Sequence, residues 1–133
     1  MTTSTTHESE EAVKGVLDRL QDTWQAGDAD AVSQIYTDDA TLIMTGVFLN
    51  GREEIRQFMA AAFAGALAGS RPHNVPRLIR RINDDTVVVI SDIGILLAGQ
   101  DQVADGEHRI ATWTITRLAD GWRVAAYHNC PVP

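Results

Sequence analysis

His128 is the side chain best placed to do chemistry, because a predicted turn near the end of the chain sets it opposite a tryptophan. Asp120-Gly121 is typical of a two-residue β-hairpin turn of type I′, and counting outward from it pairs Trp113 with His128. Opposed residues share one face of a sheet. A histidine in an apolar wall could orient a ligand or transfer a proton near neutral pH. It could equally be a core histidine bonded to a carbonyl, and the sequence leaves both possibilities open.

The same register predicts which hairpin residues point inward. Trp113, Ala126, His128 and Cys130 share the more apolar face, which we assign to the inside, whereas a threonine-rich face points outward. A turn one residue longer would shift the register by one and separate Trp113 from His128. Cys130 and His128 are two residues apart on one strand, about 7 Å, which is too far for a direct hydrogen bond between a nucleophile and its base.

Other polar groups favour structural roles. The histidines lack the spacing of metal ligands, so no metal site is expected. Asp38 and Asp39 are adjacent at the start of a strand and point apart, so capping is favoured over a catalytic carboxylate pair. Asp92 lies in the apolar run 87–97, where an unpaired charge is costly. It could be exposed on one face, act as a pocket acid, or be paired across a subunit interface, which we favour. The arginines that could supply a partner are Arg77, Arg80 and Arg81.

Helices in the first half and strands in the second half must position these residues. Val13, Val16, Leu17, Leu20 and Trp24 repeat at helical spacing and predict one amphipathic helix. The elements predicted after it are a short helix capped by Asp28, a strand at 41–45, a helix at about 52–67, and strands at about 75–82, 86–97, 108–118 and 122–129. Helices followed by a meander of strands predict an α+β domain.

Length and charge exclude several classes of protein. A chain of 133 residues suits one domain, with residues 1–7 as a disordered tail and 8–133 as the domain. The net charge of −7 argues against nucleic acid or an anionic membrane as the main partner. A single cysteine and the lack of a signal-peptide pattern predict a cytoplasmic protein, and no apolar run is long enough to span a membrane.

Several motifs together resemble one known superfamily. They are W24-x-x-G-D-x-x-x-V32, D38-D-A40, G51-x-x-x-I-x-x-F58, A111-T-W-T-I-T116 and G121-W-R-V-A-A-Y-H-N129. The first three resemble the nuclear-transport-factor-like superfamily, which includes SnoaL-like proteins and ketosteroid isomerase. The last two look like its SgcJ/EcaC family, some members of which occur among enediyne-biosynthesis proteins. The resemblance implies a cone-shaped curved sheet, mixed or antiparallel, wrapped around three N-terminal helices and enclosing one internal pocket.

Ketosteroid isomerase is an informative contrast within this superfamily. The resemblance places its general-base aspartate on Met44, its tyrosine on Leu20 and its oxyanion aspartate on Trp113. None of these three can do the isomerase chemistry, so no steroid isomerisation is expected. Leu20, Met44 and Trp113, together with Trp24 and Phe58, are therefore predicted to form an apolar, aromatic ligand-binding wall.

Three functions remain open from the sequence. The chain could be a small-molecule-binding protein of enediyne or polyketide biosynthesis that takes an apolar ligand. It could be a cofactor-free isomerase or cyclase with His128 as acid or base. It could be a structural dimerisation module whose cavity is filled by side chains. No cofactor is expected. The doubly apolar strand at 87–97 and the threonine-rich outer face of the hairpin predict a homodimer through the outer face of the sheet.

Overall fold

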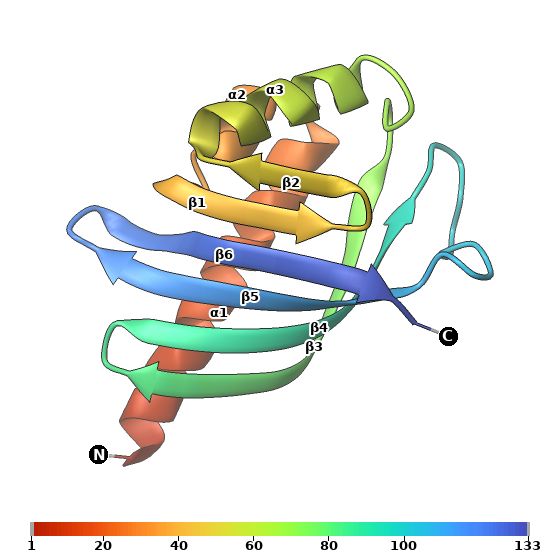
Figure 1. Ribbon diagram of the computed structural model, residues 1–133. Coiled ribbons are helices and arrows are strands. Elements are labelled where there is room, and N and C mark those ends of the chain that lie inside the picture. Colours follow the sequence, from red (N-terminus) through yellow and green to blue (C-terminus); the bar gives the residue numbers. More distant parts are fainter. Residues whose placement is uncertain (1, 133) are drawn as a thin grey trace.

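A curved sheet of six strands forms one layer, and the helices cover one of its faces (Figure 1). The computed structural model describes residues 2–132, and the side chains of residues 2–6 lie outside the description. The sheet order is β2-β1-β6-β5-β4-β3, with β1 parallel to β6 and every other neighbouring pair antiparallel. The predicted α+β fold with a mixed sheet is therefore confirmed. The strands are β1 (Tyr36–Met44), β2 (Val47–Asn50), β3 (Arg71–Asn83), β4 (Thr86–Leu96), β5 (Arg109–Leu118) and β6 (Gly121–Pro131).

The helices are α1 (Thr2–Gln25), α2 (Ala29–Ser33) and α3 (Arg52–Phe63). The Asp28 carboxylate accepts a hydrogen bond from the Ala31 backbone N–H at 3.0 Å, so the predicted N-cap of α2 is confirmed. The helix α1 begins at Thr2, within the segment 1–7 that the sequence predicted to be a disordered tail. Because the side chains of residues 1–6 lie outside the described part, the limits of the domain stay a prediction.

The hairpin of β1 and β2 was only partly predicted. The predicted strand at 41–45 belongs to a longer strand β1, and β2 is an additional strand that pairs with it from Thr41↔Asn50 to Met44↔Val47. Gly46, with φ of 77°, adopts the left-handed conformation that reverses the chain between them. The four residues of β2 are too few to show a clear alternation of apolar and polar side chains.

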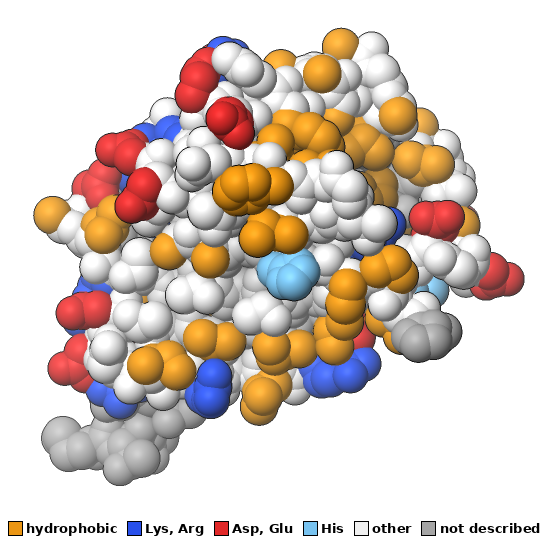
Figure 2. Space-filling view, viewed as in Figure 1, with side chains coloured by type: hydrophobic (Ala, Val, Ile, Leu, Met, Phe, Trp, Pro, Cys, Tyr) orange, Lys and Arg blue, Asp and Glu red, His pale blue; other side chains and the backbone are white. Residues whose placement is uncertain are grey.

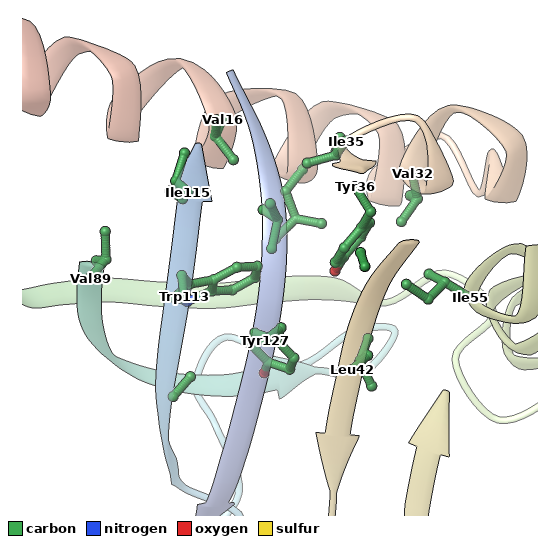
Figure 3. Packing of buried hydrophobic residues seen from close by; sticks show 14 of the residues in the cluster. Val16, Val32, Ile35, Tyr36, Leu42, Ile55, Val89, Trp113, Ile115 and Tyr127 are labelled. Atoms are coloured by element: carbon green, nitrogen blue, oxygen red, sulfur yellow. The ribbon is translucent and has the colours of Figure 1, made fainter. Parts of the chain in front are cut away.

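The core lies between α1 and the helix-facing side of the sheet (Figure 3). Val16 of α1 packs over Ile115 and Val89, which point up from neighbouring strands, and all three are at most 1% exposed. Burying an aliphatic side chain of this kind contributes about 1.5–3 kcal/mol. This packing fixes α1 against the sheet, and Leu20 and Trp24, nearer the end of the same helix, line a cavity between the two layers. Among the described residues, no helix is long and apolar enough to cross a membrane.

Asp92 has its partner within the chain. The guanidinium of Arg77 lies 2.6 Å from the Asp92 carboxylate, and both side chains are well exposed on the outer face. One of the arginines named from the sequence is thus a partner, and it belongs to the same chain; pairing across a subunit interface stays a prediction. Arg77 lies on β3, two residues after Val75, and Val75 pairs with Asp92 on the neighbouring strand β4.

Candidate ligand-binding cavity

A cavity of about 710 Å³ lies between the sheet and the helices α1 and α3. This volume falls within the range of small-molecule sites, roughly 300–1,000 Å³. Most of its wall is apolar. The predicted ligand-binding residues that line it are Leu20, Trp24, Met44, Phe58 and Trp113. Whether they contact a ligand stays a prediction.

Trp24 is fixed as part of the apolar wall. Its indole N–H donates to the Ser70 hydroxyl at 2.9 Å, so its polar atom is already paired. Its ring meets Phe63 edge to face, with 5.6 Å between ring centroids. A ligand would therefore meet only the ring surface of Trp24.

The β5–β6 hairpin differs in register from the predicted one. A type I′ turn needs positive φ at both central residues, and no described residue other than glycine has positive φ. The turn lies one residue earlier than predicted, and a bulge at Ala125 follows. The net shift is one residue, so Trp113 pairs with Tyr127 instead of His128.

Because of this shift, the residues of β6 that were predicted to line the site do not point into the cavity. His128 is exposed and pairs with Ile43 and Thr112. Cys130 is also exposed, and Ala126 is partly buried. None of these three residues lines the cavity. The predictions that His128 acts there as acid or base, and that Ala126 and Cys130 bind the ligand, are therefore wrong.

Tyr127 and Asn129 occupy the inward face in their place. The rings of Tyr127 and Trp113 lie 4.3 Å apart at 53°, and both point to the helix-covered side of the sheet (Figure 3). The Asn129 amide N–H donates to the Tyr127 hydroxyl at 2.7 Å, while its carbonyl oxygen accepts from Arg109 at 3.3 Å. The Tyr127 hydroxyl accepts this bond, so its own proton can be donated to a ligand.

Both tyrosines of the chain line this cavity as neutral phenols. Burial raises the pKa of Tyr127 to about 12, although the hydrogen bond from Asn129 and the charge of Arg109 act in the opposite direction. Burial also raises the pKa of Tyr36, and the neighbouring Tyr127 adds to that rise. Near neutral pH both groups are therefore hydrogen-bond donors rather than bases.

Two buried polar atoms in the cavity wall have no hydrogen-bond partner within residues 7–132, whose side chains the structure describes. They are the indole N–H nitrogen of Trp113 and the side-chain carbonyl oxygen of Asn74. Trp113 is 3% exposed, so bulk water does not readily satisfy it. A buried unpaired donor or acceptor costs about 1–3 kcal/mol. A ligand with oxygen functions could pair with both atoms.

A loop between β4 and β5 forms part of the wall. Gln100, Ala104 and Glu107 come from this loop and line the cavity. Val103 anchors it, because this residue is 7% exposed and packs directly over Gly94 of β4. A β-carbon at position 94 would lie only 2.6 Å from a Val103 methyl carbon, so the close approach requires glycine.

Sequence reasoning missed the polar groups because it missed the bulge. Tyr127 and Asn129 are polar residues on a predicted strand, and only the register decides their face. Arg109 lies four positions before Trp113 on β5, so it shares the inward face in either register, and its place at the start of the strand was the signal that could have found it. Tyr36 begins β1, ahead of the predicted strand at 41–45. Within the part of the chain that the structure describes, no cluster of three or more histidine, cysteine, aspartate or glutamate side chains could hold a metal ion.

The chain belongs to the SnoaL-like domain family, whose model matches residues 13–133. No curated protein matches the sequence significantly.

Solved structures share the fold over nearly the whole chain. A domain of unknown function with a cystatin-like fold from Nostoc punctiforme has a TM-score of 0.83 and 22% identity, covering 95% of this chain and 78% of that one. An NTF2-like protein with a cystatin-like fold from Novosphingobium aromaticivorans has a TM-score of 0.79 and 18% identity, covering 98% and 86%. An NTF2-like protein of unknown function from Shewanella oneidensis has a TM-score of 0.75 and 18% identity, covering 91% and 98%.

Proposed function

We propose that this protein binds an apolar, oxygen-bearing small molecule in the cavity. The observation that carries the proposal is the pairing of an apolar wall of about 710 Å³ with two buried, unpartnered polar atoms, on Trp113 and Asn74. The wall would supply affinity through burial of apolar surface. A carbonyl or hydroxyl oxygen would accept from the Trp113 indole N–H, and a hydroxyl group would donate to Asn74.

A role in natural-product biosynthesis fits this chemistry. Polyketide-derived aromatic molecules combine flat apolar rings with carbonyl and hydroxyl groups, which is the combination that the wall would accept. The sequence motifs that resemble the SgcJ/EcaC family support the same proposal, including its enediyne branch.

Two probes of nearly equal shape test the proposal. Acetylnaphthalene carries a carbonyl oxygen, and ethylnaphthalene lacks it. We expect both to bind, with the ketone favoured about fivefold because one net hydrogen bond contributes about 1 kcal/mol. Calorimetric titration would measure both affinities. The absence of binding by either probe would contradict the proposal.

The Trp113→Phe variant isolates the indole donor. We expect it to lose the preference for the ketone while it keeps affinity for the hydrocarbon. Trp24→Phe is the matched control, because the Trp24 N–H is already bonded to Ser70. That variant should retain the preference. An unchanged preference in Trp113→Phe would show that this N–H does not contact the ligand.

A cofactor-free isomerase or cyclase is the second candidate. Two neutral tyrosine hydroxyls in the cavity favour it, because a phenol can stabilise charge that develops on a carbonyl oxygen. His128 cannot be its acid or base in this cavity. The groups in the wall that could accept a proton are His73 and Glu107. A reaction that stops in Tyr127→Phe with unchanged probe binding would select this function.

We also propose that two copies pair through the outer face of the sheet, as the sequence predicts. Figure 2 shows hydrophobic side chains over the middle of this face, with most charged groups nearer its rim. The strand register sets Phe48, Ile43 and His128 in one row across it. Phe48 is 63% exposed and Ile43 is 40% exposed, which is unusual for apolar residues that stay in water. A dimerisation role without any ligand is not favoured, because side chains leave the cavity open.

A further inference from the structure

We propose that the cavity takes a ligand that also carries a carboxylate, which Arg109 binds. This inference rests on the proposed function and adds the chemical class of the ligand. Arg109 is the first residue of β5, is half-buried, and lines the same cavity as Trp113.

Among the described residues, no carboxylate pairs with Arg109, whereas most arginines of the chain have such a partner. The one hydrogen bond that its side chain makes within the described residues goes from a guanidinium nitrogen to the Asn129 side-chain carbonyl oxygen at 3.3 Å. Glu107 also lines the cavity, but its carboxylate is exposed and its oxygens lie more than 4.0 Å from the guanidinium nitrogens of Arg109, so the two do not form an ion pair. The arginines that do pair with aspartate or glutamate are Arg52, Arg56, Arg77, Arg81, Arg117 and Arg123.

Asn129 holds the Arg109 side chain in place. A guanidinium can only donate, so it needs the carbonyl oxygen of the amide, and the amide N–H is left to bond Tyr127. The amide nitrogen also lies 3.9 Å from the sulfur of Met44. Contacts on both sides of Asn129 therefore fix its orientation. A guanidinium oriented in this way, with N–H groups that bond no other described residue, suits the two oxygens of a carboxylate.

The spacing along β5 indicates the length of the ligand. Arg109, Ala111 and Trp113 share the inward face of β5, and Trp113 lies four positions after Arg109. At about 3.3 Å per residue, their α-carbons are roughly 13 Å apart. A molecule of two or three fused rings could place a carboxylate at Arg109 and extend its apolar body toward Trp113. On the neighbouring strand β6, Asn129 lies opposite Ala111 and Tyr127 lies opposite Trp113, so their side chains could bond a further oxygen of the ligand.

Among the described residues of the cavity wall, Arg109 is the only arginine or lysine. His73 and Asn74 of β3 lie near the same end, since Asn74 and Arg109 both pair with Ile93. The neutral amide of Asn74 contributes an acceptor and would not attract an anion. Arg109 is thus the cation on which carboxylate recognition would depend.

Naphthoate and naphthamide test the inference, because they share one shape and differ in charge. We expect wild-type protein to bind naphthoate about tenfold more tightly than naphthamide, since hydrogen bonds to a charged group are among the stronger ones. Arg109→Gln should remove this preference and leave naphthamide binding within about twofold. Arg109→Lys should keep part of it. Arg80→Gln, on an exposed arginine of β3 outside the cavity, is the control for net charge and should retain the preference.

Two results would overturn the inference, and they differ from failure of the proposed function. Wild-type protein that binds both probes equally would show that Arg109 does not recognise the carboxylate, although the cavity still binds small molecules. Equal loss of both probes in Arg109→Gln would assign Arg109 a structural role only. If acetylnaphthalene, naphthamide and naphthoate all fail to bind wild-type protein, the proposed function fails as well.

Discussion

Gly94→Ala should loosen the loop that walls the cavity. The added β-carbon would lie 2.6 Å and 2.7 Å from the two methyl carbons of Val103. Ordinary contacts between carbon atoms are about 3.5–4.0 Å, so roughly 1 Å of separation is missing. Val103 is the buried residue that anchors the loop. Gly94 lies on β4, which is hydrogen-bonded to β3 on one side and to β5 on the other and so cannot easily shift. The loop must therefore move.

The expected cost is that of overpacking, about 1–3 kcal/mol of the free energy of unfolding. For a domain of this length, that loss lowers the melting temperature by about 3–10 °C. Urea unfolding followed by circular dichroism would measure it. Gly15→Ala is the matched control, because nothing lies within 4 Å of a β-carbon there. That change should raise stability by up to about 1 kcal/mol, since Gly15 lies in α1.

A double-mutant cycle with Val103→Ala decides whether the contact is the cause. Val103→Ala alone should cost about 1–2 kcal/mol through lost packing. In the double variant the nearest remaining atom to the new β-carbon is the Val103 β-carbon, at 3.2 Å, so much of the clash is relieved. The two losses should therefore fall short of additivity by about 1 kcal/mol. Additive losses, or a Gly94→Ala variant as stable as wild type, would refute the reasoning.

Three further predictions concern the tyrosines, the outer face and catalysis. Ultraviolet titration should show neither of the two tyrosines ionising at pH 10 in the folded protein, because burial raises both pKa values. The unfolded chain loses its phenolic protons near pH 10, so the free energy of unfolding should fall as the pH rises from about 10 to about 12. The Tyr127→Phe variant should show a smaller fall. Ionisation of either tyrosine near pH 10 in the folded protein would contradict their burial. Phe48→Asp should convert the proposed dimer to a monomer, as measured by sedimentation equilibrium. Leu118→Asp, at the tip of the β5–β6 hairpin, is the control and should leave the dimer intact. A wild-type mass near 14.5 kDa would exclude the dimer. The protein should show no ketosteroid isomerase activity because Met44 cannot act as a base, and measurable steroid isomerisation would show that a different wall residue supplies one.

The sequence predicted the fold well because the fold depends on periodicity. The apolar stripe of Val13, Val16 and Leu20 defines α1, and the same residues are buried in the structure. The positions equivalent to the isomerase residues, Leu20, Met44 and Trp113, do line the cavity. These predictions do not depend on the exact register between β5 and β6.

The polar residues of the site were predicted wrongly, because the register of β6 was wrong by one residue. A side chain changes face with each residue along a strand, so the bulge at Ala125 exchanged His128 for Tyr127 and Asn129. A bulge depends on how β6 fits between β1 and β5, which are far apart in sequence. The bond between Asn129 and Arg109 likewise joins residues 20 positions apart and follows from the register alone.

Binding of acetylnaphthalene to wild-type protein and to Ala62→Trp, measured by calorimetric titration, tests ligand binding in the cavity most directly. Ala62 of α3 lines the cavity and is partly buried, so an indole at this position would fill part of its volume. We expect saturable binding of one molecule per chain by the wild type and loss of binding in a folded Ala62→Trp variant. Equal binding by both proteins would place the ligand elsewhere, and absence of binding by the wild type would contradict a ligand-binding cavity.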